Sequence, residues 1–252
     1  MTIDQLAEQL RRIESETAAL VAAARVDVSA PVAGCPGWDV AKLCDHMGTV
    51  QRWSATALRT STQPDRSSLE RPTKGAEVDF LASGVGTLLE ALRNRHAEDP
   101  VWNFSKAPQV ASFWGRRQMH EVTIHRWDAQ RAVGKPDPID PAVAIDGIDE
   151  LFDIFVPMRL GGRDGIDIGG SVHLHCTDVP EGSGEHAGEW TFHTSDGIFS
   201  LHRGHAKGDC ALRGPASDLL LMLWRRIPPS AESLTAFGDT TVLDRWLALG
   251  AP

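Results

Sequence analysis

The sequence predicts a two-domain α+β protein, with a helical bundle followed by a small domain of strands and helices. At 252 residues, the chain has room for two domains of about 100–150 residues. Apolar residues recur at helical spacing in the first half and alternate with polar residues after residue 170. The Gly-rich segment LGGRDGIDIGG separates the two patterns and is typical of a flexible joint. We therefore expect one domain over 1–158 and a second over 159–252.

The first half contains five predicted helices, recognised by apolar residues three or four positions apart. The Pro36-Gly37 pair comes just before the second helix, and the breaker GKPDPIDP follows the fourth. The helices are predicted at 3–25, 38–59, about 81–92, 112–132 and about 141–158. The inward stripe of the second helix includes His46 among apolar residues. The first four helices are therefore expected to form a four-helix bundle that encloses a polar cluster.

The second half begins with predicted strands. Residues 172–176 alternate apolar and polar side chains, as in a half-buried strand. The segment EWTFHTSDGIFSLHR reads as a hairpin, because Asp196-Gly197 suits a type I′ turn and would pair Phe192 with Leu201. Two further helices are expected in GPASDLLLMLWRRIPP and DTTVLDRWLAL. This half is therefore predicted to be α+β.

Composition excludes several classes of function. The chain carries 25 Lys+Arg against 34 Asp+Glu, for a formal charge of −9, and has no basic run, so it is not expected to bind nucleic acid. No apolar stretch suits a membrane span, and the start does not resemble a secretory signal. The 4 cysteines show no C-x-x-C spacing. We expect a cytoplasmic protein that does not associate with membranes and contains no disulfide framework.

The most informative motif is WGRRQMHEVTIHRWD, at 114–128. In a helix, Glu121 and His125 lie only about 40° apart around the axis, so both can face one metal ion. His120 resembles the first histidine of the zinc-protease motif H-E-x-x-H, but it lies about 140° from His125 and is expected to be structural or at the rim of a site. A metal site here therefore needs a further ligand from another element.

The inward-facing His46 is the candidate for that ligand. Two histidines and one carboxylate would leave a coordination position open for water or a substrate atom. One helical turn from the motif's ligands, Arg117 could contact an anionic substrate or simply pair with Glu121. Asp128 could orient the imidazole of His125. The alternative is an ordinary helix in which Glu121 pairs with an arginine and the histidines bind nothing.

Histidines are also frequent in the second half. They lie at positions 173, 175, 193, 202 and 205. His173 and His175 share one face of a predicted strand, which makes a second metal site conceivable. Because the spacing is not ordered as in known Cys/His sites, the pattern favours solvated histidines on a sheet face.

Three segments together resemble a known family. They are APVAGCPGWDVAKLCDHMGTVQRW, the pattern E121-x-x-x-H125-R-W-D128, and GPASDLLLMLWRRIPP with GDTTVLDRWLAL. They resemble the mycothiol-dependent maleylpyruvate isomerase family over nearly the whole chain. The resemblance implies a DinB-like four-helix bundle, a sterol-carrier-like C-terminal domain, and Zn²⁺ bound by His46, Glu121 and His125. It also implies that Arg226 contacts the thiol cosubstrate, mycothiol.

The family resemblance implies a thiol-dependent enzyme that acts on an electrophilic small molecule. Zinc favours the thiolate form of a bound thiol, which could attack an electrophilic carbon without any nucleophile from the protein. The expected reaction is S-transfer or isomerisation. One alternative is a zinc hydrolase that activates water. The other is a non-catalytic protein that binds a small molecule.

Overall fold

The computed structural model describes residues 3–134, 136–161 and 166–249 and divides the chain into two compact units, 1–137 and 138–252. The first unit is helical and the second combines a mixed sheet with helices, which confirms the predicted two-domain α+β class. The division differs from the boundary expected after residue 158. It falls before α5 (Pro141–Glu150), because this helix packs against α7 (Ala216–Leu223) of the second unit.

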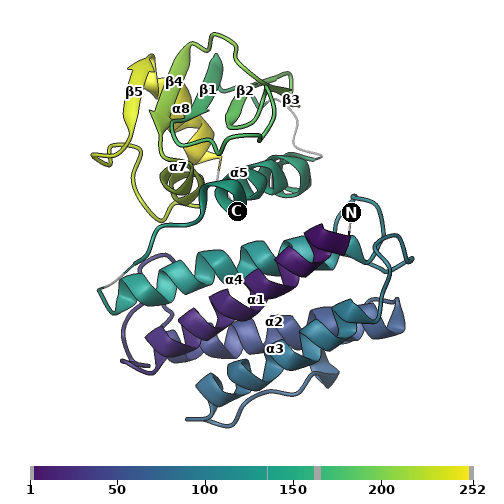
Figure 1. Ribbon diagram of the computed structural model, residues 1–252. Helices are drawn as coiled ribbons and strands as arrows, with labels where there is room; N and C mark the ends of the chain where they lie inside the picture. Colours follow the sequence, from purple (N-terminus) through teal and green to yellow (C-terminus); the bar gives the residue numbers. More distant parts are fainter. Residues whose placement is uncertain (1–2, 135, 162–165, 250–252) are drawn as a thin grey trace. The chain divides into compact units, whose positions relative to one another are not determined.

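Four helices form the first unit, and Figure 1 shows them side by side. They are α1 (Ile3–Ala24), α2 (Val40–Thr60), α3 (Glu77–Arg93) and α4 (Ser112–Ala132), with the short η1 (Arg66–Ser68) between α2 and α3. Asp39 starts α2, because its side chain accepts a hydrogen bond from the Lys42 backbone N–H at 2.8 Å. The main pairs are α1 with α4 and α2 with α3. The four predicted bundle helices are thus present.

An aromatic cluster joins α2, α4 and the segment between α3 and α4. Trp114 is fully buried, and its ring lies 5.2 Å from that of Trp53 and 6.1 Å from that of Trp102. The Trp114 indole N–H also donates to the Trp102 carbonyl at 2.8 Å. The cluster fixes the connection before α4, because it buries aromatic surface and because the indole N–H of Trp114 has a hydrogen-bond partner. It thereby holds α4 in register with α2.

The second unit contains a five-stranded sheet and several helices. The helical segments are α5, the π-helical η2 (Leu151–Phe155), α6 (Val156–Leu160), α7 and α8 (Thr240–Ala248). The strands are β1 (Ser171–Cys176), β2 (Glu189–Ser195), β3 (Ile198–Arg203), β4 (Cys210–Gly214) and β5 (Thr235–Gly238). Their order is β3-β2-β1-β4-β5, with β1 and β4 parallel and the other pairs antiparallel. The predicted helix over 141–158 is thus interrupted by a π-helical turn.

The hairpin between β2 and β3 has the predicted turn and register. Asp196 and Gly197 have φ values of 52° and 77°, and a type I′ turn requires positive φ at both positions. Phe192 pairs with Leu201 across the strands, as expected. The Phe192 face of the sheet is apolar, and the ring of Trp246 from α8 lies 4.6 Å from that of Phe192. The opposite face carries the histidines.

None of the helices within the described residues is long and apolar enough to cross a membrane. This agrees with the sequence, which contains no apolar stretch that suits a membrane span.

Candidate metal centre

Three side chains predicted to share a site come together between α2 and α4. The Nε2 atom of His46 lies 3.0 Å from Oε1 of Glu121, and Nε2 of His125 lies 3.6 Å from the same oxygen. The three potential ligand atoms all lie within 4.8 Å of one another. His46 and Glu121 are 75 positions apart in the sequence, yet with His125 they form one compact donor set.

Asp128 fixes the orientation of His125. Its Oδ2 atom lies 3.0 Å from Nδ1 of His125, which leaves Nε2 directed toward Glu121. The Asp128 side chain is almost fully buried, and the Sγ atom of Cys35 lies 3.8 Å from the same Oδ2. A carboxylate on the outer nitrogen of a histidine is the usual support for a metal-binding imidazole. The contact expected for Asp128 from the sequence is present.

Arg117 is buried and forms an ion pair with Oε2 of Glu121. The pairing takes one carboxylate oxygen and leaves the other, Oε1, facing the two histidines. Burial opposes ionisation of Glu121, but the charge of Arg117 and hydrogen bonds with His125 and His46 hold its pKa well below the usual range. Burial likewise opposes charging of His125, whereas its contacts with Asp128, Cys35 and Glu121 raise its pKa well above the usual range. The site thus favours an ionised carboxylate.

Trp38 forms one wall of the site. Its ring lies 4.9 Å from that of His46 and 6.4 Å from that of His125. The segment before α2 holds this tryptophan in place, because the Trp38 carbonyl accepts a hydrogen bond from the Val32 backbone N–H at 2.9 Å. The same ring lines a cavity beside His46, so it gives that cavity an apolar wall next to the donor set.

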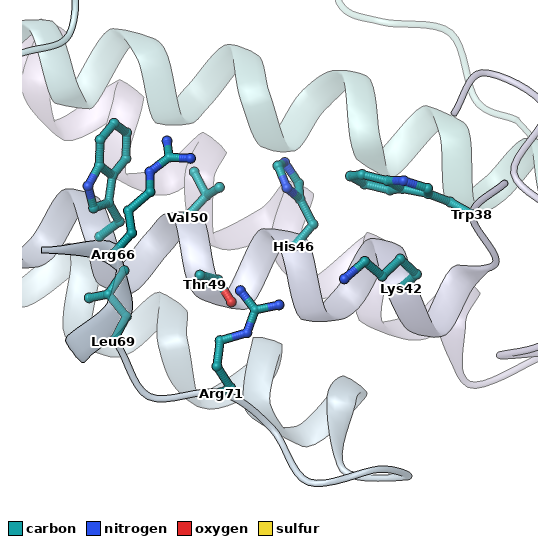
Figure 2. Close-up of a pocket in the computed structure, with 9 residues that line it drawn as sticks. Trp38, Lys42, His46, Thr49, Val50, Arg66, Leu69 and Arg71 are labelled. Atoms are coloured by element: carbon teal, nitrogen blue, oxygen red, sulfur yellow. The ribbon is translucent and has the colours of Figure 1, made fainter. Parts of the chain in front are cut away.

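A basic cavity of about 220 Å³ opens beside His46. In Figure 2 the side chains of Lys42, Arg66 and Arg71 lie around it. Asp45 accepts hydrogen bonds from Lys42 at 3.0 Å and from Arg71 at 2.6 Å, so the cationic groups outnumber this carboxylate. The cavity is therefore suited to an anionic ligand, although the chain as a whole is acidic.

The sequence pattern does not predict these cationic residues as part of the site. Lys42 could have been found, because it lies one helical turn before His46 on the same face. Arg66 and Arg71 come from the connection after α2, which has no periodicity to reveal their direction. Arg117, the substrate contact considered from the sequence, pairs with Glu121 and does not line this cavity.

Two other predicted residues lie outside the cluster. His120 is buried on α4 but is not one of its three potential ligands. Arg226 lies just after α7 in the second unit, where its Nη1 donates to the Trp224 carbonyl at 2.9 Å. Its predicted contact with a thiol stays a prediction.

The buried thiols of the chain are unsuited to act as nucleophiles. Burial raises the pKa of Cys44 to about 12, and burial with nearby carboxylates does the same for Cys176. A thiol with such a pKa is almost entirely protonated at neutral pH, whereas the thiolate is the reactive form. Neither Cys44 nor Cys176 is therefore a candidate nucleophile.

The donor set fits a zinc ion. Two imidazole nitrogens and one carboxylate oxygen are established ligands for catalytic zinc, and three protein ligands leave a fourth position free. The carboxylate is ionised, as coordination requires, and Nε2 of each imidazole faces it. Zinc binding would displace the proton that the raised pKa of His125 favours on its ring. The buried Asp128 supplies the outer support that such sites need.

The fold and the site define a class of two-domain protein, in which a helical bundle carries a histidine–carboxylate cluster and an α+β domain follows it. Family models match most of the chain and identify its family. The mycothiol maleylpyruvate isomerase N-terminal domain matches residues 10–130, and the MDMPI C-terminal domain matches residues 142–245. The chain belongs to the mycothiol-dependent maleylpyruvate isomerase family.

A solved structure shares the fold. The crystal structure of the mycothiol-dependent maleylpyruvate isomerase matches with a TM-score of 0.53 and 13% sequence identity, over 94% of this chain and 95% of that chain. At this identity the match shows a common fold. A comparison with curated protein sequences gave no significant match.

Proposed function

We propose that this chain is a zinc enzyme that uses mycothiol to attack an anionic, electrophilic small molecule. One observation supports it above all: Nε2 atoms from two helices converge on a single oxygen of Glu121, at 3.0 and 3.6 Å. His46, Glu121 and His125 would hold the ion. When bound, zinc would lower the pKa of the thiol and so supply a thiolate at neutral pH.

The surrounding residues have separate tasks in this proposal. Asp128 keeps Nδ1 of His125 occupied, so that Nε2 stays directed to the ion. Arg117 holds the Glu121 carboxylate in place and in its ionised form. Trp38 shields one side of the site from water. These contacts position the site before any substrate arrives, which is where much of the catalytic advantage of an enzyme originates.

The positive charge of the cavity beside His46 supports an anionic substrate. Lys42, Arg66 and Arg71 would bind carboxylate groups of a small acid, with the reactive carbon near His46. The thiolate would add to a carbon of a conjugated double bond, and a proton would neutralise the resulting carbanion. Rotation about the new single bond, loss of that proton and departure of the thiolate would give the geometric isomer. Retention of the carbon–sulfur bond would give S-transfer instead.

A turnover assay with and without thiol tests this function. We expect the zinc-loaded protein to convert maleylpyruvate only when mycothiol is present. The amount of free thiol should stay constant during isomerisation and fall by one molecule per product during S-transfer. Equal rates without thiol would instead indicate water activation by a hydrolase, and tight binding without turnover would indicate a binding protein. Either result would overturn the proposal.

Replacing Arg66 tests the anionic substrate site. Its guanidinium lies 4.4 Å from the centre of the Trp53 ring at the cavity wall, so it is held where a substrate carboxylate would bind. We expect Arg66→Ala to raise KM for an acidic substrate about 10- to 100-fold, the range of a lost charge-assisted hydrogen bond. The control is Arg59→Ala, because Arg59 is exposed, pairs with Glu90 and does not line the cavity. A KM that does not change would remove Arg66 from the substrate site.

A further inference from the structure

A second group of metal-ligating side chains lies on the polar face of the sheet in the other unit. We call it the sheet-face cluster; its members are His173, His175, Glu189 and His205. Their potential ligand atoms all lie within 4.8 Å of one another. The proposed mycothiol reaction uses none of them, because the residues assigned to it above all lie in the helical unit.

The cluster is centred on one carboxylate oxygen. Oε2 of Glu189 lies 2.7 Å from Nδ1 of His205, 2.9 Å from Nε2 of His173 and 3.3 Å from Nδ1 of His175. A single carboxylate oxygen offers about two lone pairs, so three nitrogens around it exceed what hydrogen bonding needs. If all three imidazoles were protonated to bind the carboxylate, they would repel one another. A single bound cation would satisfy all four groups together.

The fold builds this arrangement from three adjacent segments. His173 and His175 are two residues apart on β1 and so point to the same face. Glu189 of β2 lies directly opposite His175 in the antiparallel register. After β3 the chain turns at Gly204, whose φ is 113°, and this turn brings His205 over the start of β2.

The site combines one fixed ligand with one adjustable ligand. The His173 side chain is only 8% exposed, whereas that of His205 is 77% exposed. The segment after β3 covers His173, because a Cβ on Gly208 would lie 3.0 Å from the Cβ of that histidine. A metal ion could therefore enter from solvent beside His205, and this side chain could then close over it.

We propose that the sheet-face cluster binds one divalent transition-metal ion, Zn²⁺ first, with all four side chains as ligands. Imidazole with one carboxylate suits zinc, whereas Ca²⁺ and Mg²⁺ prefer oxygen ligands alone. In a tetrahedral zinc site, ligand atoms about 2.05 Å from the ion lie about 3.3 Å from each other. The spacings around Glu189 Oε2, 2.7 to 3.3 Å, require only small movements to match.

Four protein ligands make this a closed, structural site. The ion would join β1, β2 and the segment after β3, so binding stabilises the second unit. The strand ladder already joins β1 to β2. The main effect therefore falls on the segment that carries His205, which follows the last residue of β3.

Zinc content measured in a background without the first site tests this proposal. The background is the full chain with His46→Ala and His125→Ala, stripped with a chelator, reloaded with Zn²⁺ and passed through gel filtration. We expect one zinc ion per chain and a higher melting temperature with zinc than without it. Adding His173→Ala and His175→Ala should reduce the zinc content to zero and abolish the shift in melting temperature.

A matched control uses two histidines from the same sheet face. His193 and His202 lie on β2 and β3 and are exposed, but they do not belong to the cluster. The background with His193→Ala and His202→Ala should keep its single zinc ion. A folded background chain, checked by circular dichroism, that retains no zinc after gel filtration would overturn the proposal, as would zinc that survives the His173/His175 replacement. Because the first site is absent throughout, the outcome does not depend on the proposed mycothiol reaction.

Discussion

Replacing His46 with alanine is expected to remove one zinc ion per chain and nearly all thiol-dependent turnover. His46 is the only one of the three proposed ligands that comes from α2, so its loss leaves two ligands on a single helix. Two ligands hold zinc far more weakly than three. Because a catalytic zinc ion would contribute several kcal/mol to the stabilisation of the transition state, we expect kcat/KM to fall about a thousandfold or more. Elemental analysis and the mycothiol assay measure both effects.

The matched control for this variant is His96→Ala, since His96 is an exposed histidine of the same unit. It should keep the zinc content and rate of the unaltered chain. Circular dichroism of His46→Ala should show the native helical content, because His46 is half-buried and its removal leaves no large cavity. A His46→Ala chain that retains its full zinc content would show that the ion binds elsewhere.

The three proposed ligands in the helical unit could be predicted, because the face of a helix on which a residue lies follows from its local sequence spacing. Glu121 and His125 are four residues apart on α4, and His46 lies on the inward stripe of α2, so helix geometry and bundle packing bring them together. The bounds of α4 were predicted correctly for the same reason, since a breaker follows a long periodic segment. Likewise, Asp196-Gly197 predicted both the turn and the register of its hairpin.

The remaining features depend on contacts between distant segments. β4 and β5 are short, and the sequence does not predict them, because the pairing of β4 with β1 and of β5 with β4 is not encoded by local alternation. The sequence likewise showed five histidines in the second half without showing which ones meet. Pairing of β1 with β2 and the turn at Gly204 select His173, His175 and His205 and leave the other two outside.

The structure bears most directly on the expected role of Arg117. From the sequence it was a candidate contact for an acidic substrate, with pairing to Glu121 as the alternative. Because it is buried and forms an ion pair with Glu121, we propose that Arg117 positions that carboxylate. We therefore expect Arg117→Ala to weaken zinc binding about 10- to 100-fold, as loss of an outer support does in other metal sites. The rate at limiting zinc should fall in proportion.

A substrate contact would give a different pattern of kinetics. Loss of such a contact raises KM and leaves zinc affinity unchanged, whereas loss of a positioning residue lowers zinc affinity and, once zinc is saturating, leaves KM for the acid close to that of the unaltered chain. Arg117→Lys separates charge from geometry, because lysine keeps the charge near Glu121 but lacks the planar, forked donor. We expect it to restore part of the zinc affinity. Unchanged zinc affinity in Arg117→Ala, together with a raised KM, would return Arg117 to the substrate site.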